Sequence, residues 1–310
     1  LLLLLGSNQV FLGIGFTILR WPLVLLTGLL FMVKPHLRKQ RLFQITYLVM
    51  GLWLGESVYR GIRYTEWGRK ETNGKEVTIS SYNLFFKNKY QQNIIQEIQK
   101  EDPDVVLLQE FTSQWKSTLS SSLFQRYPHR HLGARKGPYG AAILSKYPII
   151  ERENIQFGDY KIKVQRVKLK VGKQFLHLAN IHLTSPAAAV RHPDRFFSYY
   201  LRNYQSRKDE WKALHDQLAK VPHDEPVIIG GDFNTMRWEP LYRDIRFDYQ
   251  DLFRKKGKGW RGTFPHIESF PFPPLTLDYL MYRGPIKGLE SKILPGSSAD
   301  HLGLWGKFEI

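Results

Sequence analysis

The sequence predicts an α/β domain of packed sheets covered by helices, and three observations support this. From residue 76 onward, strand-like and helix-like stretches alternate along the chain. Polar and ionisable residues stand where several of the predicted strands end. The composition is 43% hydrophobic and 14% aromatic, which is enough apolar material for a large core. The first 60 residues follow a different pattern.

Residues 1–60 are predicted to anchor the chain in a membrane through transmembrane helices. Residues 10–33 are almost wholly apolar, and residues 42–59 form a second apolar run. A span needs about 20 residues, so the first run is long enough and the second only just. Residues 34–41 between them hold four Lys and Arg residues, and such basic loops tend to face the cytoplasm. The domain after the second run is then expected on the non-cytoplasmic face.

Two other features bear on this N-terminal prediction. The alternative to a membrane anchor is that the two apolar runs form a buried helical hairpin in a soluble protein. Residues 1–5 fit the end of an earlier transmembrane span. Residues 61–75 are predicted to be a linker to a domain of residues 76–310. Four basic residues after the second run favour the opposite orientation: Arg60, Arg63, Arg69 and Lys70.

Periodicity predicts the elements of the domain. Short apolar or alternating runs predict strands at residues 77–82, 104–109, 141–145, 160–171, 174–183, 227–231, 277–282 and 302–310. Apolar residues at helical spacing predict helices at residues 88–100, 111–124 and 207–221. Two segments rich in aromatic residues are predicted to be loops, residues 184–207 and 262–274.

Composition excludes some chemistries and favours certain ligands. The chain has no cysteine, so disulfides, thiolate zinc sites and cysteine nucleophiles are excluded. Its net charge is +17, and residues 1–75 hold only 10 of the 45 basic and 3 of the 28 acidic residues. The domain is therefore basic too. This favours a polyanionic substrate, an anionic membrane surface or both, with ordinary solubility charge as the alternative.

Residues 227–235 combine an apolar strand with two polar side chains at its end. The run closes on Gly230 and Gly231, and Asp232 and Asn234 follow. Residues two apart on an extended backbone point the same way, so both side chains are expected beyond the strand end. Gly231 would let the backbone bend or a ligand come close. The alternative is an Asx-type turn.

Polar residues also follow other predicted strands, at the ends where α/β sheets build their sites. Taken singly, Asn83 could cap a turn, Glu110 could begin a helix, and His182 could be a core histidine. Their repetition along the chain predicts a site composed of Asn83, Glu110, His182, Asp232, Asn234, Asp278, Asp300 and His301.

Seven short motifs contain these residues and run through residues 76–310: Ser-Tyr-Asn83, Leu-Leu-Gln-Glu110, Gly-Ala-Ala-Ile-Leu-Ser-Lys-Tyr-Pro148, Asn-Ile-His-Leu183, Gly-Gly-Asp-Phe-Asn234, Leu-Asp-Tyr279 and Ala-Asp-His301. As an ordered set they resemble the endonuclease/exonuclease/phosphatase superfamily, here as a membrane-anchored member of bacterial type. That superfamily includes deoxyribonucleases, apurinic-site endonucleases, neutral sphingomyelinases and inositol polyphosphate phosphatases. Ala299 departs from the Ser that the family usually has before Asp-His.

The resemblance implies a four-layer α/β sandwich, two packed mixed sheets flanked by helices, and metal-dependent cleavage of a phosphoester. Mg²⁺ or Mn²⁺ is expected as the cofactor, with Glu110 as ligand and Asn83 and Asp300 near it. Such hard cations prefer oxygen ligands and neutralise charge on a phosphoryl group.

The resemblance also implies roles for the other five residues. His301 would be the general base or a transition-state stabiliser, and Asp278 would accept its other N–H. Asp232 would position or deprotonate the attacking water, and which of Asp232 and His301 is the base stays open. Asn234 and His182 would contact the phosphate.

The sequence leaves three functions open. A nuclease acting outside the cytoplasm is slightly favoured by the basic domain, because cations and aromatic residues suit single-stranded nucleic acid. A phospholipid phosphodiesterase or phosphatase of the sphingomyelinase kind is favoured by the predicted anchor and lipid bilayer. A non-catalytic membrane-binding module is disfavoured by the complete residue set. No protein partner is predicted.

Overall fold

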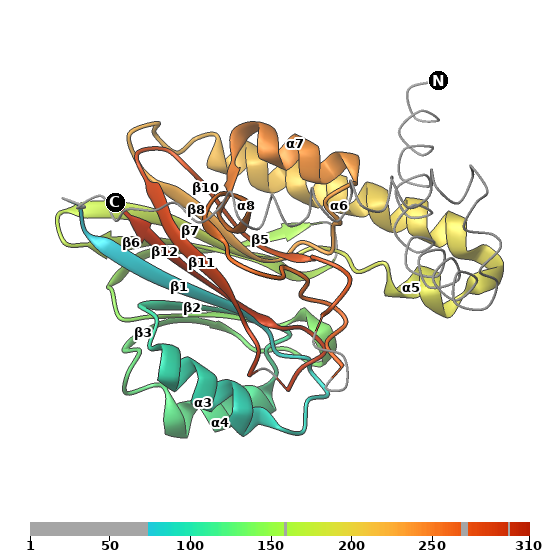
Figure 1. Cartoon of the computed structure of the whole chain (residues 1–310), viewed down its shortest axis with the longest axis horizontal. Helices are drawn as coiled ribbons and strands as arrows, with labels where there is room; N and C mark the ends of the chain where they lie inside the picture. Colours follow the sequence, from blue (N-terminus) through green and yellow to red (C-terminus); the bar gives the residue numbers. More distant parts are fainter. Residues whose placement is uncertain (1–73, 158–159, 268–271, 297) are drawn as a thin grey trace, which may run out of the picture. The chain divides into compact units, whose positions relative to one another are not determined.

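Two six-stranded sheets of mixed direction form the centre of the protein (Figure 1). The computed structural model describes residues 74–157, 160–267, 272–296 and 298–310. The predicted spans at residues 10–33 and 42–59 lie outside these residues, as does most of the predicted linker. The first sheet has the order β11 (Lys287–Leu294), β12 (Gly303–Glu309), β1 (Glu76–Asn83), β2 (Val105–Gln109), β4 (Ala141–Ser145), β3 (His129–Gly133).

The second sheet contains the motif of residues 227–235 near its centre. It has the order β5 (Ile149–Phe157), β6 (Tyr160–Val171), β7 (Gln174–His182), β8 (Val227–Asp232), β10 (Asp278–Arg283), β9 (Gln250–Asp251). Each sheet contains one parallel pair, β1 with β2 and β7 with β8. The remaining pairs are antiparallel.

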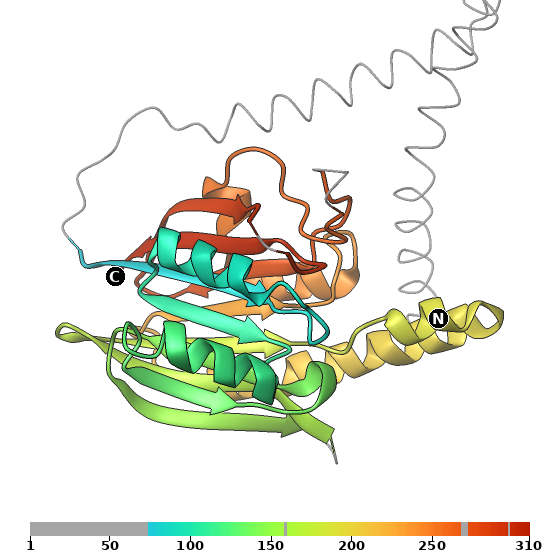
Figure 2. The same ribbon diagram turned by 90° about the horizontal axis from the view of Figure 1, so that it is seen from below.

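The helices are α3 (Gln91–Glu101), α4 (Ser113–Ser122), α5 (Ala187–Arg191), α6 (Phe196–Leu218), α7 (Pro240–Asp248) and α8 (Leu252–Lys256), with 3₁₀ turns at Gly137–Tyr139 and Pro193–Arg195. Figures 1 and 2 show α3 and α4 on the outer side of the first sheet and α6 beside the second. The predicted sandwich of two mixed sheets flanked by helices is therefore present.

The continuously apolar sequence of strand β2 is explained by the burial of both its faces. Val105 and Leu107 point into the core between the two sheets, whereas Val106 and Leu108 point toward α3 and α4. Both faces of the strand are buried, so no polar alternation is possible. Each such side chain contributes roughly 1.5–3 kcal/mol when it is removed from water.

The interior strands lie where the sequence predicts them. β4 and β6 have the predicted bounds, and the other predicted strands agree to within one residue at each end. The strands that the sequence prediction missed are β3, β5, β9 and β11, which are the four edge strands of the two sheets. Edge strands are often short or charged, and β5, with Glu-Arg-Glu at residues 151–153, has no apolar run to detect.

The prediction of a loop at residues 184–207 is wrong. The segment contains α5 and the first half of α6, which begins eleven residues before the predicted start at Arg207. The buried face of this part of α6 consists of Tyr200, Asn203 and Arg207. Their spacing is helical, but two of the three are polar, so hydrophobic periodicity does not reveal the helix. Within the described residues, none of the helices is both long and apolar enough to span a membrane.

A buried polar link crosses the apolar interface between the sheets. The Oδ1 atom of Asn180 on β7 accepts a hydrogen bond from Nε2 of Gln109 on β2 at 2.7 Å. The Nδ2 atom of Asn180 donates to the carbonyls of Leu108 at 2.9 Å and Ala142 at 3.1 Å. Both side chains are fully buried. Because Gln109 precedes Glu110 and Asn180 lies two residues before His182, this link fixes the sheets relative to each other beside the predicted site.

We expect Asn180→Leu to lower the free energy of unfolding by at least about 2 kcal/mol, because the Gln109 side chain and the carbonyls of Leu108 and Ala142 each lose a buried hydrogen bond. Urea unfolding of Asn180→Leu, Gln109→Leu and the double variant measures this. The double variant should lose less than the sum of the single losses. Asn154→Leu, which removes an exposed hydrogen bond to His131, is the control. Additive losses would contradict a link between the two side chains.

Candidate active site

The eight predicted site residues come from the two sheets in equal numbers. Asn83 ends β1, Glu110 follows β2, and Asp300 and His301 precede β12, all in the first sheet. His182 ends β7, Asp232 ends β8, Asn234 follows it, and Asp278 begins β10, all in the second sheet. Asp232 is the register partner of both His182 and Asp278. The site therefore lies where corresponding ends of the two sheets meet.

One carboxylate oxygen, Oδ2 of Asp232, is the point on which both halves converge. The Asp232 side chain is almost fully buried. Four nitrogen atoms surround this oxygen: Nδ2 of Asn83 at 3.1 Å, Nδ2 of Asn234 at 3.1 Å, Nε2 of His182 at 3.6 Å and Nε2 of His301 at 3.8 Å. The two amides hydrogen-bond to it directly. The two imidazoles lie slightly farther away.

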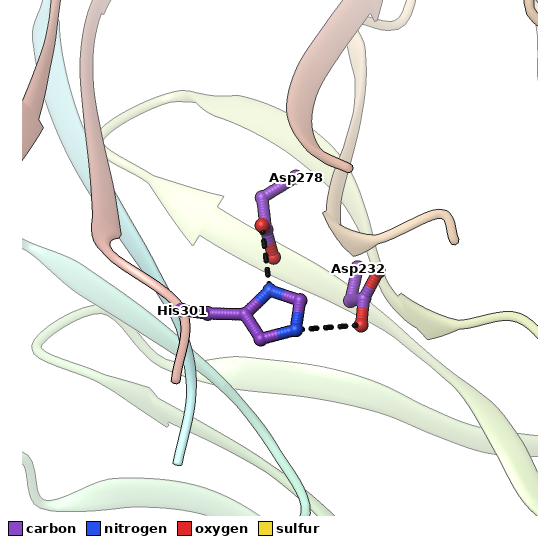
Figure 3. Close-up of side chains that lie close together, drawn as sticks. All are labelled: Asp232, Asp278 and His301. Carbon is purple, nitrogen blue, oxygen red and sulfur yellow. Dashed lines mark hydrogen bonds and ion pairs between the residues drawn. The ribbon is translucent and has the colours of Figure 1, made fainter. Parts of the chain in front are cut away.

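The ring of His301 is held in one orientation. Its Nδ1 lies 2.9 Å from Oδ2 of Asp278, and its Nε2 points toward Asp232 (Figure 3). The ring of Phe264 packs against it with a centroid separation of 4.7 Å. The hydroxyl of Thr263 accepts the backbone N–H of Asp278 at 3.4 Å and so fixes the start of β10. The arrangement of carboxylate, imidazole and carboxylate is built for moving or holding a proton.

Burial and mutual charge set the protonation of this group. Burial alone would lower the pKa of His301, but the carboxylates of Asp278, Asp232 and Asp300 raise that pKa to about 10. Burial raises the pKa of Asp232 to about 6, although the charges of His301 and His182 oppose the rise. At neutral pH an imidazolium therefore faces a carboxylate.

A second acidic group lies on the first sheet. Oε2 of Glu110 accepts the backbone N–H of Phe86 at 2.9 Å, and Oε1 has a long contact of 3.4 Å with Nδ2 of Asn83. Oδ1 of Asp300 is buried and has no hydrogen-bond partner in the described part of the chain. Burial raises the pKa of both carboxyl groups, and the charge of Glu110 raises that of Asp300 further. These under-satisfied oxygens fit a divalent cation, which prefers such ligands.

Another set of potential ligands is less suited to a metal ion. Ligand atoms of Asp232, Asp278 and His301 lie within 4.8 Å of one another. However, Nδ1 of His301 already bonds to Asp278, and the raised pKa makes the ring a cation at neutral pH. A protonated imidazole has no lone pair for a metal. These three residues are therefore better suited to acid–base work, and Glu110 and Asp300, with Asn83 beside them, are the residues that could hold a metal ion.

The turn after β8 needs its particular residues. Gly231 has φ of +137°, and a Cβ there would lie 2.0 Å from the carbonyl oxygen of Ile181, so a side chain is excluded. Asn234 is not extended, as the sequence suggested, but left-handed at φ of +46°. Its backbone N–H donates to Oδ1 of Asp232 at 2.8 Å, which is an Asx turn. The carboxylate of Asp232 thus belongs both to this turn, through Oδ1, and to the candidate site, through Oδ2.

Sequence reasoning missed the residues that support this site. Thr263 and Phe264 belong to the segment predicted to be a substrate loop, yet they contact Asp278 and His301. Neither stands in a motif, and both are distant in sequence from the residues they hold. Only the fold brings them together.

The loop that carries Asp300 and His301 is fastened from two sides. From α3 and the turn before it, Glu97 accepts the backbone N–H of Gly296, and the carbonyl of Tyr90 accepts the hydroxyl of Ser298 at 2.7 Å. On the other side, the backbone N–H of His266 donates to the carbonyl of Asp300 at 2.8 Å. Ala299, where the family usually has Ser, is buried in the apolar cluster beneath α3 and α4. An apolar residue suits that position.

Comparison with known proteins agrees with this fold. The pattern of the endonuclease/exonuclease/phosphatase family matches residues 80–301, so the chain belongs to this family of phosphoesterases. Phospholipase C of Staphylococcus aureus is 24% identical to it over 245 residues, which cover 71% of this chain and 68% of that protein. Protein angel homolog 2 of Danio rerio is 23% identical over 214 residues, which cover 58% of this chain and 34% of that protein.

Solved structures share the fold at lower identity. D. rerio TDP2 complexed with single strand DNA product has a TM-score of 0.61 and 17% identity, covering 76% of this chain and 100% of that one. A protein of unknown function from Enterococcus faecalis V583 has a TM-score of 0.59 and 18% identity, covering 74% and 98%. At these identities the structures establish the fold.

The buried carboxyl group of Glu97 makes the free energy of unfolding depend on pH. Burial raises the pKa of Glu97 from 4.5 to about 7, although the hydrogen bond from Gly296 lowers it. The native state therefore binds one more proton than the unfolded state between these values, so the free energy of unfolding falls as pH rises through this window, by at most roughly 3 kcal/mol. Glu97→Gln keeps an acceptor for Gly296 and should remove this slope.

Thermal unfolding of wild type and Glu97→Gln from pH 4.5 to 8 checks this, with the difference in Tm as the readout. Glu76→Gln, which changes an exposed carboxylate, serves as the control and should keep the wild-type slope. An unchanged slope in Glu97→Gln would contradict the proposed origin of the pH dependence.

Proposed function

We propose that this chain is a divalent-metal-dependent phosphodiesterase. The observation that supports it most is the convergence of Asn83, Asn234, His182 and His301 on Oδ2 of Asp232, with Asp278 behind His301. The carboxylate of Asp232 can accept a proton from an attacking water, and the imidazolium of His301 can donate to a phosphoryl oxygen beside it. Hydrolysis of a phosphodiester requires both functions at one point.

The metal would be held by Glu110 and Asp300, with Asn83 next to Glu110. When bound, Mg²⁺ or Mn²⁺ would neutralise charge on the phosphoryl and leaving oxygens. The buried, partnerless Oδ1 of Asp300 and the weakly satisfied Oε1 of Glu110 support this assignment. In Asn83, the amide oxygen accepts from Phe85 and the amide nitrogen donates to both carboxylates, so its task is to orient Glu110 and Asp232.

The remaining residues divide the proton chemistry. Asp232 accepts the proton of the attacking water, and His301, fixed by Asp278, presents its Nε2–H to the phosphoryl group. His182 adds a second imidazole on the same side. Both N–H groups of the Asn234 amide are donated inside the protein, to Asp232 at 3.1 Å and to the Leu183 carbonyl at 3.0 Å. We therefore assign Asn234 to positioning Asp232 rather than to binding phosphate.

Two substrate classes have support. A phospholipid is favoured by the similarity to phospholipase C of S. aureus and by the predicted anchor. A nucleic acid is favoured by the net charge of +17. We also propose that residues 10–33 and 42–59 hold the domain of residues 76–310 at a membrane, on the non-cytoplasmic face, because of their length and the basic segment between them.

His301→Ala and Asp232→Ala are each expected to lower kcat on bis(4-nitrophenyl) phosphate by at least about 10²-fold, the scale of losing a positioned acid or base. Asp278→Asn should lower it too, since the orientation of the His301 ring is lost. His215→Ala, an exposed histidine on α6 paired with Asp248, is the control and should be neutral. Near-normal turnover in a folded His301→Ala or Asp232→Ala variant would refute that residue's role.

Removal of metal is expected to abolish hydrolysis, and Mg²⁺ or Mn²⁺ should restore it. The full chain, dialysed against chelator, is assayed on bis(4-nitrophenyl) phosphate, plasmid DNA, single-stranded RNA and phospholipid vesicles before and after metal is added. Full activity after exhaustive chelation would end the metal proposal. Glu110→Gln should raise the metal concentration needed for half-maximal activity, whereas Glu76→Gln should leave it unchanged.

A further inference from the structure

The helical segment after β7, residues 187–204, extends away from the two sheets. It consists of α5, the short turn Pro193–Arg195 and the first half of α6, and we call it the α5–α6 projection. Figures 1 and 2 show from two directions that it reaches beyond the strands, with α5 packed against α6. A segment that adds little to the core of the sandwich has a surface available for another purpose.

The exposed side chains of this projection are a mixture of arginine and apolar residues. Val190 is 70% exposed, Phe197 is 59% exposed and Leu201 is 39% exposed. Arg191, Arg195 and Arg202 are also exposed, and Asp194 is the one acidic residue of the segment. Exposed apolar residues beside cations are typical of helices that lie at the interface of an anionic bilayer.

Most aromatic rings of the projection pack against neighbours within it, and Phe197 is the exposed exception. Base stacking requires open ring faces. Tyr199 stacks on His192 at 4.8 Å and has the guanidinium of Arg202 over its ring, while Phe196 stacks on Tyr200 at 5.8 Å. These rings are used within the projection itself. The apolar side chains left outside are Val190, Leu201 and Phe197, and the two aliphatic ones suit lipid because they have no ring face for a base.

The projection is joined directly to the candidate active site. Thr184, two residues after His182, donates its backbone N–H to Oε2 of Glu210 at 2.8 Å. Nδ2 of Asn203 donates to the carbonyl of Ser185 at 3.1 Å. Glu210 and Asn203 on α6 therefore hold the turn that follows β7. The attachment of the projection therefore lies beside the end of β7, one of the strand ends where the site is built.

We propose that the α5–α6 projection docks this protein on an anionic lipid bilayer, so that the substrate of the adjacent site is a phosphodiester of a phospholipid headgroup. The substrate half of this statement rests on the proposed phosphodiesterase function. The docking half rests on charge complementarity between the three exposed arginines and anionic headgroups, and on the exposed aliphatic residues that accompany them.

A site-specific label tests docking without reference to activity. The chain has no cysteine, so Leu201→Cys and Val190→Cys can each carry one environment-sensitive dye in the full chain. Ile150→Cys is the matched control, because Ile150 is 46% exposed and lies at the end of β5 opposite the site. Dye emission is measured with nanodiscs of phosphatidylcholine alone, nanodiscs containing phosphatidylglycerol, and single-stranded DNA.

We expect emission from positions 190 and 201 to rise at least twofold with phosphatidylglycerol nanodiscs only, and to return toward baseline as salt is raised. Position 150 should not respond. An equal response to nanodiscs of phosphatidylcholine alone would overturn docking on anionic lipid and assign the face to a neutral bilayer. Emission that is already high before any lipid is added would also overturn it, and would assign the face to the chain's own N-terminal residues. A response to DNA in place of lipid would overturn it in favour of nucleic acid.

Charge reversal separates docking from chemistry. Arg195→Glu with Arg202→Glu should abolish the dye response and lower hydrolysis of phosphatidylglycerol-containing vesicles at least tenfold, with bis(4-nitrophenyl) phosphate hydrolysis unchanged. Lys100→Glu with Lys116→Glu, on α3 and α4, is the control of equal charge and should change neither. Vesicle hydrolysis insensitive to the arginine reversal would overturn the inference alone. Loss of all diester hydrolysis in wild type would instead overturn the proposed function, while the dye still reports docking.

Discussion

The site depends on the relative position of two sheets whose strands, within the described residues, do not pair with each other. Each sheet supplies four of the eight site residues, so a shift between the sheets would separate the chemistry into two inactive halves. Several polar contacts between the sheets set that position. They include the buried hydrogen bond of Gln109 to Asn180 below the site and, within the site, the contacts of His301 with Asp278 and of Asn83 with Asp232. Apolar packing alone resists sliding weakly, because it has no direction, whereas a buried hydrogen bond is lost if its partners move by an ångström.

Burial of the Asp232 carboxylate determines how the site is charged. A buried carboxylate is costly unless donors and counter-charges surround it, and here two amides and two imidazoles do so. The same burial raises its pKa to about 6, close enough to neutrality for proton transfer while leaving it ionised. Glu110 and Asp300 are less well compensated: Glu110 accepts one short hydrogen bond, from Phe86, and Oδ1 of Asp300 has no partner within the described residues. The site thus has one well-compensated carboxylate, Asp232, and two that a cation would complement.

The candidate site residues and the interior strands could be predicted from the sequence because each produces a recognisable pattern of neighbouring residues. An interior strand is an apolar run, and a polar residue placed directly after one stands out, as Glu110 and Asp232 do. The four edge strands produce no such pattern, since one side of each is solvated. The helical start of α6 was hidden because its buried face contains Asn203 and Arg207. Thr263 and Phe264 could not be found at all, because their contacts with Asp278 and His301 exist only in the folded chain.

The roles proposed for the candidate site residues concern the phosphate, which lipid and nucleic acid phosphodiesters share, so we expect discrimination to come from surfaces that surround the site. Helix α6 connects such a surface to the centre. One part of it, through Asn203 and Glu210, fixes the turn that follows His182, and the part before Asn203 forms the exposed projection. The same helix therefore contacts the turn after His182 and carries the surface that we propose to bind a bilayer. The proposed docking surface and the end of β7 are thus linked through one helix.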